Sequence, residues 1–131
     1  MPKILIDTSI IIDYLRQKDK SKTLLYYFGH HRYQLYASII THAESYAGKS
    51  VWERKEAMEL LEKLFSNIKI LPLEERFSKK AGLISATNHN LEIVDAIIAS
   101  TAISFDLELA TFNIKDFEKI EGIKLFQRTR V

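Results

Sequence analysis

The stretch KILIDTS, residues 3–9, joins a short apolar run to one carboxylate, Asp7, and two hydroxyl side chains. The apolar run predicts a buried strand over Lys3–Ile6, and Thr8 or Ser9 can cap the helix that follows it. In open α/β sheets, binding and catalytic sites gather outside the carboxyl ends of the strands. Asp7 is therefore a candidate site residue as well as a candidate helix cap.

Strands and helices alternate along the rest of the chain, as hydrophobic spacing and turn residues indicate. The predicted helices cover residues 8–16, Lys22–His30, Ile40–Ala47, Val51–Phe65, Glu74–Thr87 and Leu91–Ser104, and the later strands Leu35–Ser38, Ile68–Leu71, Leu107–Thr111 and, as a fifth, Ile123–Phe126. This alternation predicts an α/β fold with a parallel sheet of four to five strands and helices on both faces.

The composition restricts the classes of function. The 131 residues suit a single domain. The absence of cysteine excludes disulfides, zinc–thiolate sites and cysteine nucleophiles, and it favours an intracellular, cytoplasmic location. No apolar stretch approaches the length of a membrane span, and the N-terminal apolar run is too short for a signal peptide. A net charge of +2 does not in itself demand a nucleic-acid partner.

Three further acids stand beside predicted elements. Glu44 lies on a short helix among small residues, and Asp95 stands just ahead of the apolar run AIIA. Asp116 follows the last clear strand in the segment TFNIKDF, together with Thr111 and Asn113. An acid on so apolar a helix as that of Asp95 is rare unless it is paired, capping or bound to metal.

Each acid also has an ordinary structural explanation. Asp7 can be a helix cap, Glu44 an exposed helix residue, and Asp95 a charge favoured by the helix dipole. Taken together, however, carboxylates gathered at strand ends repel one another unless a cation neutralises them. Mg²⁺ or Mn²⁺ is the natural partner of such oxygen ligands. The pattern therefore predicts a metal-dependent hydrolase of phosphate esters. The histidines fit no zinc motif.

The order of these motifs resembles that of the PIN domain. The motifs are DTS after a strand, a helix glutamate, an aspartate that opens an apolar helix, and TxNxxDF after a strand. The length of the chain, with the resemblance running from Met1 to about Phe126, is similar to that of the VapC toxins of toxin–antitoxin pairs. This resemblance implies a three-layer α/β/α fold and a Mg²⁺- or Mn²⁺-dependent endoribonuclease.

The resemblance also implies roles for individual residues. It makes Asp7, Glu44 and Asp95 the core acids, with Asp116 and Asn113 completing the metal site. It gives Thr8, Ser9 and Thr111 the task of orienting the acids or binding metal through water, and it places Phe112 where many relatives carry arginine. Four basic residues are candidates for holding the RNA backbone, namely Lys49, Lys115, Arg128 and Arg130.

The partners expected are RNA, a second copy of the chain, and a small VapB-like antitoxin whose tail lies near the first helices. The apolar surplus around Tyr26–Phe28 and along Trp52–Phe65 supports such interfaces. Three alternatives stay open at this point. They are a housekeeping PIN nuclease in RNA processing, a non-catalytic binding module on the same fold, and a phosphoacceptor receiver, whose acidic pair and middle-strand aspartate are missing here.

Overall fold

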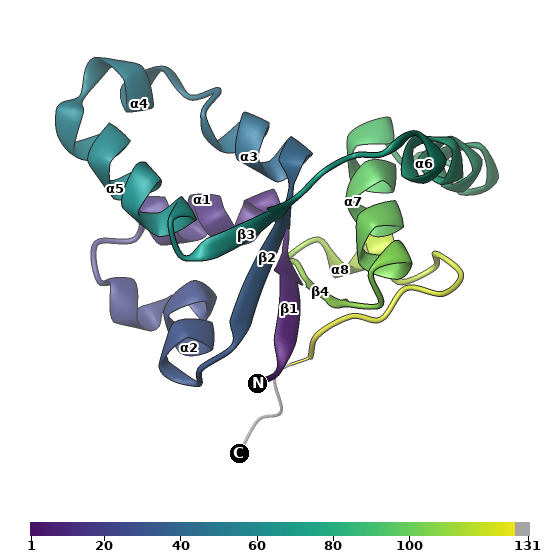
Figure 1. Ribbon diagram of the computed structural model, residues 1–131, viewed down its shortest axis with the longest axis horizontal. Helices are drawn as coiled ribbons and strands as arrows, with labels where there is room; N and C mark the ends of the chain where they lie inside the picture. Colours follow the sequence, from purple (N-terminus) through teal and green to yellow (C-terminus); the bar gives the residue numbers. More distant parts are fainter. Residues whose placement is uncertain (128–131) are drawn as a thin grey trace.

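A four-stranded parallel sheet forms the centre of the molecule (Figure 1). The computed structural model describes residues 1–127. The strands are β1 (Lys3–Ile6), β2 (Gln34–Ser38), β3 (Ile68–Leu71) and β4 (Glu108–Ala110), and their order in the sheet is β3-β2-β1-β4. Because β1 lies between β2 and β4, the residue that follows β1 sits in the middle of the carboxyl edge of the sheet.

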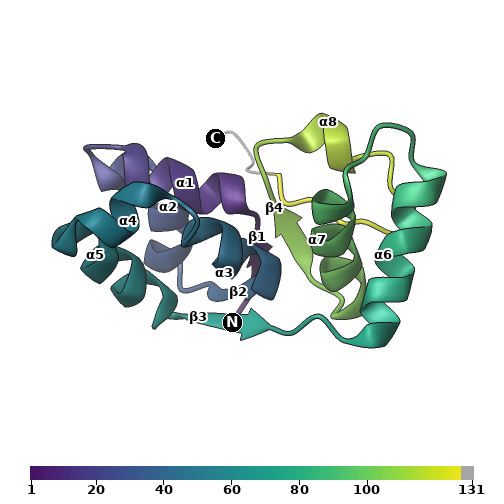
Figure 2. The ribbon, with the colours of Figure 1, turned by 90° about the horizontal axis from the view of Figure 1, so that it is seen from above.

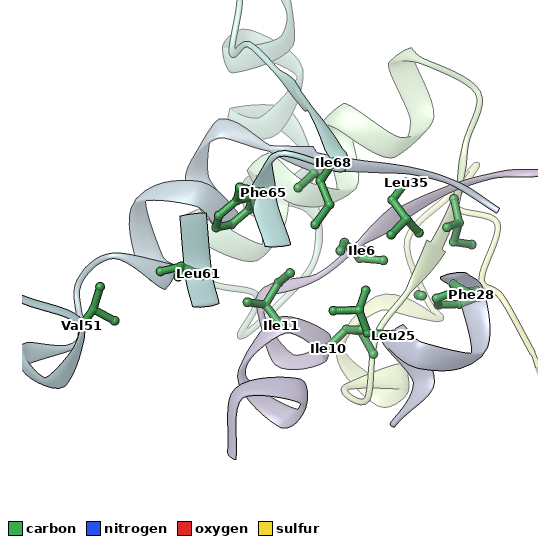
Figure 3. Packing of buried hydrophobic residues seen from close by; sticks show 13 residues of the cluster. Ile6, Ile10, Ile11, Leu25, Phe28, Leu35, Val51, Leu61, Phe65 and Ile68 are labelled. Carbon is green, nitrogen blue, oxygen red and sulfur yellow. The ribbon is translucent and has the colours of Figure 1, made fainter. Parts of the chain in front are cut away.

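Side chains of alternating residues in the strands point to opposite faces of the sheet and build two separate cores. Ile4 and Ile6 belong to one core, with residues of α1, α2, α4 and α5 (Figure 3). Leu5 belongs to the other, with residues of α6, α7 and α8. Both faces are therefore buried, which explains why the strands are almost continuously apolar in sequence.

Helices cover the two faces unequally (Figures 1 and 2). One face carries α1 (Thr8–Arg16), α2 (Leu24–His30), α4 (Lys49–Glu53) and α5 (Lys55–Phe65), and the other carries α6 (Glu75–Thr87), α7 (Ile93–Ser104) and the short α8 (Ile114–Phe117). The remaining helix, α3 (Ile39–Ser45), follows directly from β2 and contacts both α1 and α7. It therefore bridges the two halves above the sheet edge where Asp7 lies. The three-layer α/β fold with a parallel sheet is confirmed.

Two of the predicted helices are interrupted. The helix predicted over Val51–Phe65 is wrong as a single element, because the backbone at Arg54 is extended and separates α4 from α5. The helix predicted over Lys22–His30 is a 3₁₀ turn, Lys20–Lys22, followed by α2. Thr23 lies between them and caps α2, since its hydroxyl accepts a hydrogen bond from the Tyr26 amide. A capping threonine needs an extended backbone, so the helix cannot run through it.

The predicted fifth strand, Ile123–Phe126, is also wrong. The segment forms a single bridge between Leu125 and Leu109, made by hydrogen bonds from Leu109 N–H to Lys124 and from Phe126 N–H to Leu109. Gly122 has a positive φ of 88° and turns the chain just before this segment. Across residues 1–127, no helix is both long enough and apolar enough to cross a membrane.

Candidate active site

Asp7 lies at the centre of the candidate site and is held by three hydrogen bonds. Its carboxylate accepts the Thr8 amide at 2.8 Å, the Ser9 hydroxyl at 2.9 Å and the Thr111 hydroxyl at 2.7 Å. The side chain is 3% exposed and caps α1. Thr111 comes from the end of β4, so strand pairing places the donor beside the acid across 104 positions in the sequence. Hydrogen bonds to a charged group are each worth about 1.5–3 kcal/mol, which fixes this carboxylate firmly.

Glu44 approaches the same region from α3. The buried Thr8 hydroxyl lies 2.7 Å from Glu44 Oε1 and 3.1 Å from the Thr41 hydroxyl. Thr41 and Glu44 are three residues apart and therefore share one face of α3. The start of α1 thus holds both acids, since residue 7 provides one of them and residue 8 orients the other.

Asp95 stands in the first turn of α7 and is the most perturbed acid of the site. Partial burial and, after it, the negative charges of Asp7, Asp116, Glu92 and Glu44 together raise its pKa from 3.8 to about 6. No hydrogen bond or ion pair within residues 1–127 compensates its carboxylate. A half-buried, repelled and unpartnered carboxylate at a sheet edge marks a functional site more often than a structural one.

The segment after β4 brings the fourth acid to the site. Thr111 accepts a hydrogen bond from the Asn113 amide, and Ser9 accepts one from the Phe112 amide at 3.2 Å. These contacts fold residues 111–113 over the start of α1 and lead into α8, where Asp116 lies. Asp116 is exposed but close enough to raise the pKa of Asp95. Asn113 is exposed, and its side chain makes no capping hydrogen bond to α8.

The four predicted acids thus converge on one region of the carboxyl edge of the sheet. They come from the four segments that the sequence singled out. The negative charges of Asp7, Glu44 and Asp116 each raise the pKa of Asp95. They do not form a closed ligand shell: in residues 1–127, no three acidic or histidine side chains lie close enough together to enclose a metal ion. The arrangement is a cluster of like charges in which hydrogen bonds hold Asp7 and Glu44, whereas the carboxylates of Asp95 and Asp116 have no hydrogen-bond or ion-pair partner among residues 1–127.

Two hollows flank the acid cluster. The first, named here the Glu44 hollow, has a volume of about 270 Å³ and lies between α1, α3, α4 and α5. Apolar side chains line much of it, among them Ile12, Leu15 and Leu60, together with Arg16 and Arg54. The second, named the Asp116 hollow, has a volume of about 420 Å³ and lies between α8 and residues 87–91, the loop from α6 to α7.

The predicted basic residues take different positions. Lys115 lines the Asp116 hollow beside Asp116 itself. Lys49 is exposed at the start of α4 and lines neither of the two hollows. Arg128 and Arg130 lie outside the described residues. Of Lys49 and Lys115, the two predicted basic residues that the structure describes, Lys115 is therefore the better placed for a ligand that reaches the acids.

Two residues of the network were not singled out from the sequence. Thr41 contacts Thr8, and Glu92 contributes to the raised pKa of Asp95. The signal for both was helical spacing, because Thr41 precedes Glu44 by three residues and Glu92 precedes Asp95 by three. In each case, the residue lies one helical turn before a suspected acid in the sequence.

Comparison with known proteins identifies the family of this fold and site. The family model described as the PIN domain matches residues 4–123, nearly the whole chain. The chain belongs to the PIN-domain family. This PIN domain is 31% identical over 130 residues to ribonuclease VapC1 of Rickettsia felis, with 93% of each chain covered. It is 30% identical over 135 residues to ribonuclease VapC1 of Methanocaldococcus jannaschii, covering 96% of this chain and 88% of the relative.

Solved structures agree with this PIN fold. DNA-bound VapBC from Salmonella typhimurium superposes with a TM-score of 0.79 at 23% identity, covering 96% of this chain and 98% of that chain. A toxin–antitoxin complex from Klebsiella pneumoniae superposes with a TM-score of 0.72 at 25% identity, covering 92% and 94%. The chain is therefore homologous to the VapC ribonuclease toxins at the level of the family.

Proposed function

We propose that this PIN domain is a Mg²⁺- or Mn²⁺-dependent endoribonuclease that hydrolyses RNA phosphodiester bonds. The observation that carries the proposal is Asp95, a carboxylate with no hydrogen-bond or ion-pair partner among residues 1–127, whose pKa is raised to about 6 by burial and by four neighbouring acids. Such repulsion is costly without a cation, and a divalent ion removes it. The ribonuclease names of its relatives support the choice of RNA as substrate.

The donor set fits a hard divalent ion in its chemistry, because it consists only of oxygen atoms. Asp7 and Asp95 are assigned as the main ligands, with Glu44, Asp116 and Asn113 completing the set. Because no three of the acids among residues 1–127 lie close enough together to enclose an ion, binding one would draw these side chains closer together. When bound, the ion lowers the pKa of a coordinated water and neutralises charge on the phosphate. Zinc has no role here, since the chain contains no cysteine and none of the zinc-binding histidine motifs.

The side chains of the site divide the remaining work. The hydroxyls of Ser9 and Thr111 hold Asp7 in one orientation. Thr8 occupies Oε1 of Glu44, which leaves Oε2 to accept a proton from the attacking water.

Chelation and readdition of metal test this proposal directly. The purified protein should cut single-stranded RNA in Mg²⁺ or Mn²⁺, lose activity in excess EDTA, and regain it when either ion is restored. Asp7→Asn and Asp95→Asn should each lower the cleavage rate at least about 100-fold, as loss of a metal ligand does. Asp13→Asn, at a half-buried position on α1 outside the acid cluster, is the matched control and should cut normally. Full activity in EDTA would contradict the metal mechanism.

The same protein is proposed to be the toxin of a toxin–antitoxin pair. The Glu44 hollow supports this assignment, because it joins an apolar lining to an acid of the cluster. A partner chain seated there can bury its own apolar residues and extend a basic side chain toward Glu44. The solved structures of toxin–antitoxin complexes with the same fold point in the same direction. The expected partner is a small VapB-like protein.

A further inference from the structure

The Asp116 hollow lies directly between two elements that carry acids of the cluster. One wall is residues 87–91, which run straight into α7 and Asp95. The other wall is α8 and the turn after it, with Lys115, Asp116 and Lys119. Anything bound in this hollow therefore reaches the acid cluster through Asp116. Its volume of about 420 Å³ lies within the range of roughly 300–1,000 Å³ typical of ligand pockets.

The loop wall is fixed by its own hydrogen bonds. The Asn88 side chain donates to the Ile84 carbonyl at 2.8 Å, and the Leu91 amide donates to the Asn88 carbonyl at 3.2 Å. The Ser85 hydroxyl ties the loop to α6 by donating to the Leu91 carbonyl at 3.2 Å. Asn90 takes a left-handed backbone, with φ of 68°, which closes the turn. The exposed His89 thus stands on a preorganised support.

The charges of the hollow suit a phosphate backbone. Lys115 and Lys119 are both exposed, and neither forms an ion pair with any of residues 1–127. Cationic side chains left without acidic partners are available to phosphate groups. His89 adds an aromatic ring with two polar nitrogens, which can stack on a base or donate to one. The lining is polar where that of the Glu44 hollow is largely apolar, which favours nucleic acid over a protein chain here.

We propose that the Asp116 hollow binds the segment of single-stranded RNA next to the cleaved bond. Lys115 and Lys119 contact its phosphates, and His89 contacts a base. This inference rests on the proposed nuclease function. It adds a binding position for the part of the RNA that extends from the acid cluster. It extends the role of Lys115 to a site that includes Lys119 and His89, which the sequence alone does not connect.

Binding measurements with a fluorescein-labelled single-stranded RNA of mixed sequence test whether RNA binds in the Asp116 hollow. The variants Lys119→Ala, Lys115→Ala and His89→Ala are made in an Asp7→Asn background, so that the RNA is bound but not cut, and are titrated in Mg²⁺ at several salt concentrations. Each lysine change should weaken binding several-fold and reduce the salt slope by about 0.7, the value for one phosphate contact on a single strand. His89→Ala should weaken binding with an unchanged slope.

Lys63→Ala, on α5 across the sheet, is the matched control. It removes the same charge from an exposed position and should leave both affinity and slope unchanged. In the cleaving protein, Lys119→Ala should raise KM while leaving kcat nearly unchanged, because the lysine does not touch the reacting phosphate.

The outcomes separate the two proposals. If the wild type cuts RNA but Lys119→Ala and Lys115→Ala match Lys63→Ala in affinity and slope, the hollow is not the substrate path. If these changes weaken a protein partner and leave RNA affinity intact, the hollow is a protein site, and the inference is equally overturned. If the wild type neither binds nor cuts RNA in Mg²⁺ or Mn²⁺, the proposed function fails and the inference fails with it.

Discussion

Hydroxyl side chains control the candidate site at the scale of single residues. Thr8, Ser9 and Thr111 orient two carboxylates, Asp7 and Glu44, through hydrogen bonds of 2.7–2.9 Å. Each hydroxyl comes from an element end, where the backbone positions it precisely enough for such short contacts. The acids provide the negative charge of the site, and the hydroxyls fix the orientation of the Asp7 and Glu44 carboxylates.

Thr111→Val should weaken metal binding without unfolding the protein. The substitution keeps the volume of the side chain but removes the 2.7 Å hydrogen bond to Asp7. Loss of a residue that orients a ligand typically costs about 10–100-fold in metal affinity or activity. Titration of cleavage against Mg²⁺ should show this shift, and Thr111→Ser should restore most of it. Ser66→Ala, which removes an exposed hydroxyl contact at the end of α5, should have no effect.

Asp95→Asn should raise the melting temperature of the metal-free protein in a pH-dependent way. The pKa of Asp95 is about 6 in the folded protein and about 3.8 when unperturbed, so the folded state holds the extra proton between these values. Stability therefore falls as pH rises through that window and stays lower above it. The stabilisation by Asn should be largest near about pH 8 and vanish near about pH 4, as thermal melts in EDTA can measure.

Asp106→Asn provides a control of opposite sign. A hydrogen bond from Lys124 and its positive charge lower the pKa of Asp106. Its contribution to stability is therefore present above the unfolded pKa and is lost as the pH falls. The Asn variant should melt at or slightly below the wild-type temperature at high pH. A pH-independent increase for Asp95→Asn would show that repulsion among the acids is not its cause.

The helix α7 is the element that ties the site to the core. Its first turn carries Asp95, and further along the helix Ala99 and Ala102 are fully buried. Small side chains allow α6 to pack closely, and the Ser100 hydroxyl donates to the Phe77 carbonyl of α6 at 2.8 Å. The position of Asp95 is therefore fixed by the packing of α7 from Ala99 onward, one helical turn further along the chain.

Ala99→Leu should lower both stability and activity. Ala99 has no exposed surface, so three added carbon atoms must displace α6 or α7. Overpacking of this kind costs about 1–3 kcal/mol in free energy of unfolding. Urea titration should reveal the loss, and RNA cleavage should fall more than for an equally destabilised variant elsewhere. Ala86→Leu, on the exposed side of α6, is the control and should be close to neutral.

At the scale of the whole molecule, the acid cluster stands between two unlike surfaces. The Glu44 hollow is largely apolar and lies over one core, whereas the Asp116 hollow is polar and lies beside the other. Exposed apolar side chains also remain elsewhere on the described surface, including Trp52 at 69% and Leu83 at 63% exposure. These two unlike surfaces match the two partners proposed above, a protein at the Glu44 hollow and RNA at the Asp116 hollow.

Leu60→Arg should weaken binding of the proposed VapB-like partner by about tenfold or more, because it puts a charge in the apolar lining of the Glu44 hollow. Titration calorimetry with the purified partner can measure the change. Cleavage by the free protein should persist. Leu83→Arg, on α6, introduces the same charge away from this hollow and should bind normally. Equal affinities for the two variants would place the partner elsewhere.

Light scattering should show a homodimer at micromolar concentration. The exposed apolar side chains that the described surface retains are the motive for this prediction. The mass should be concentration-dependent and should fall toward that of one chain on dilution. A single-chain mass at every concentration would contradict dimerisation while leaving the nuclease assignment intact.

The fold class could be predicted from the sequence, as the structure confirms, and the four acids could be predicted as site candidates, because both predictions depend on local patterns. Apolar runs and helical spacing indicate that strands and helices alternate along the chain. Each of the four acids lies beside a clearly predicted strand or helix. The break at Arg54 and the reduction of Ile123–Phe126 to one bridge were not predictable, since they depend on contacts made after the chain packs. Extended backbone at a single residue leaves no periodic signal.

The hydrogen bonds and the electrostatic interactions of the site depend on the tertiary structure, because they join segments that are far apart in the sequence. The contact from Thr111 to Asp7 spans 104 positions, and that from Thr8 to Glu44 spans 36. The raised pKa of Asp95 depends on charges from three other segments as well as its own helix. The two hollows likewise arise between elements distant in sequence. Parallel strand order brings these parts together, and no local pattern encodes the distances between them, because burial and electrostatic coupling are properties of the packed chain.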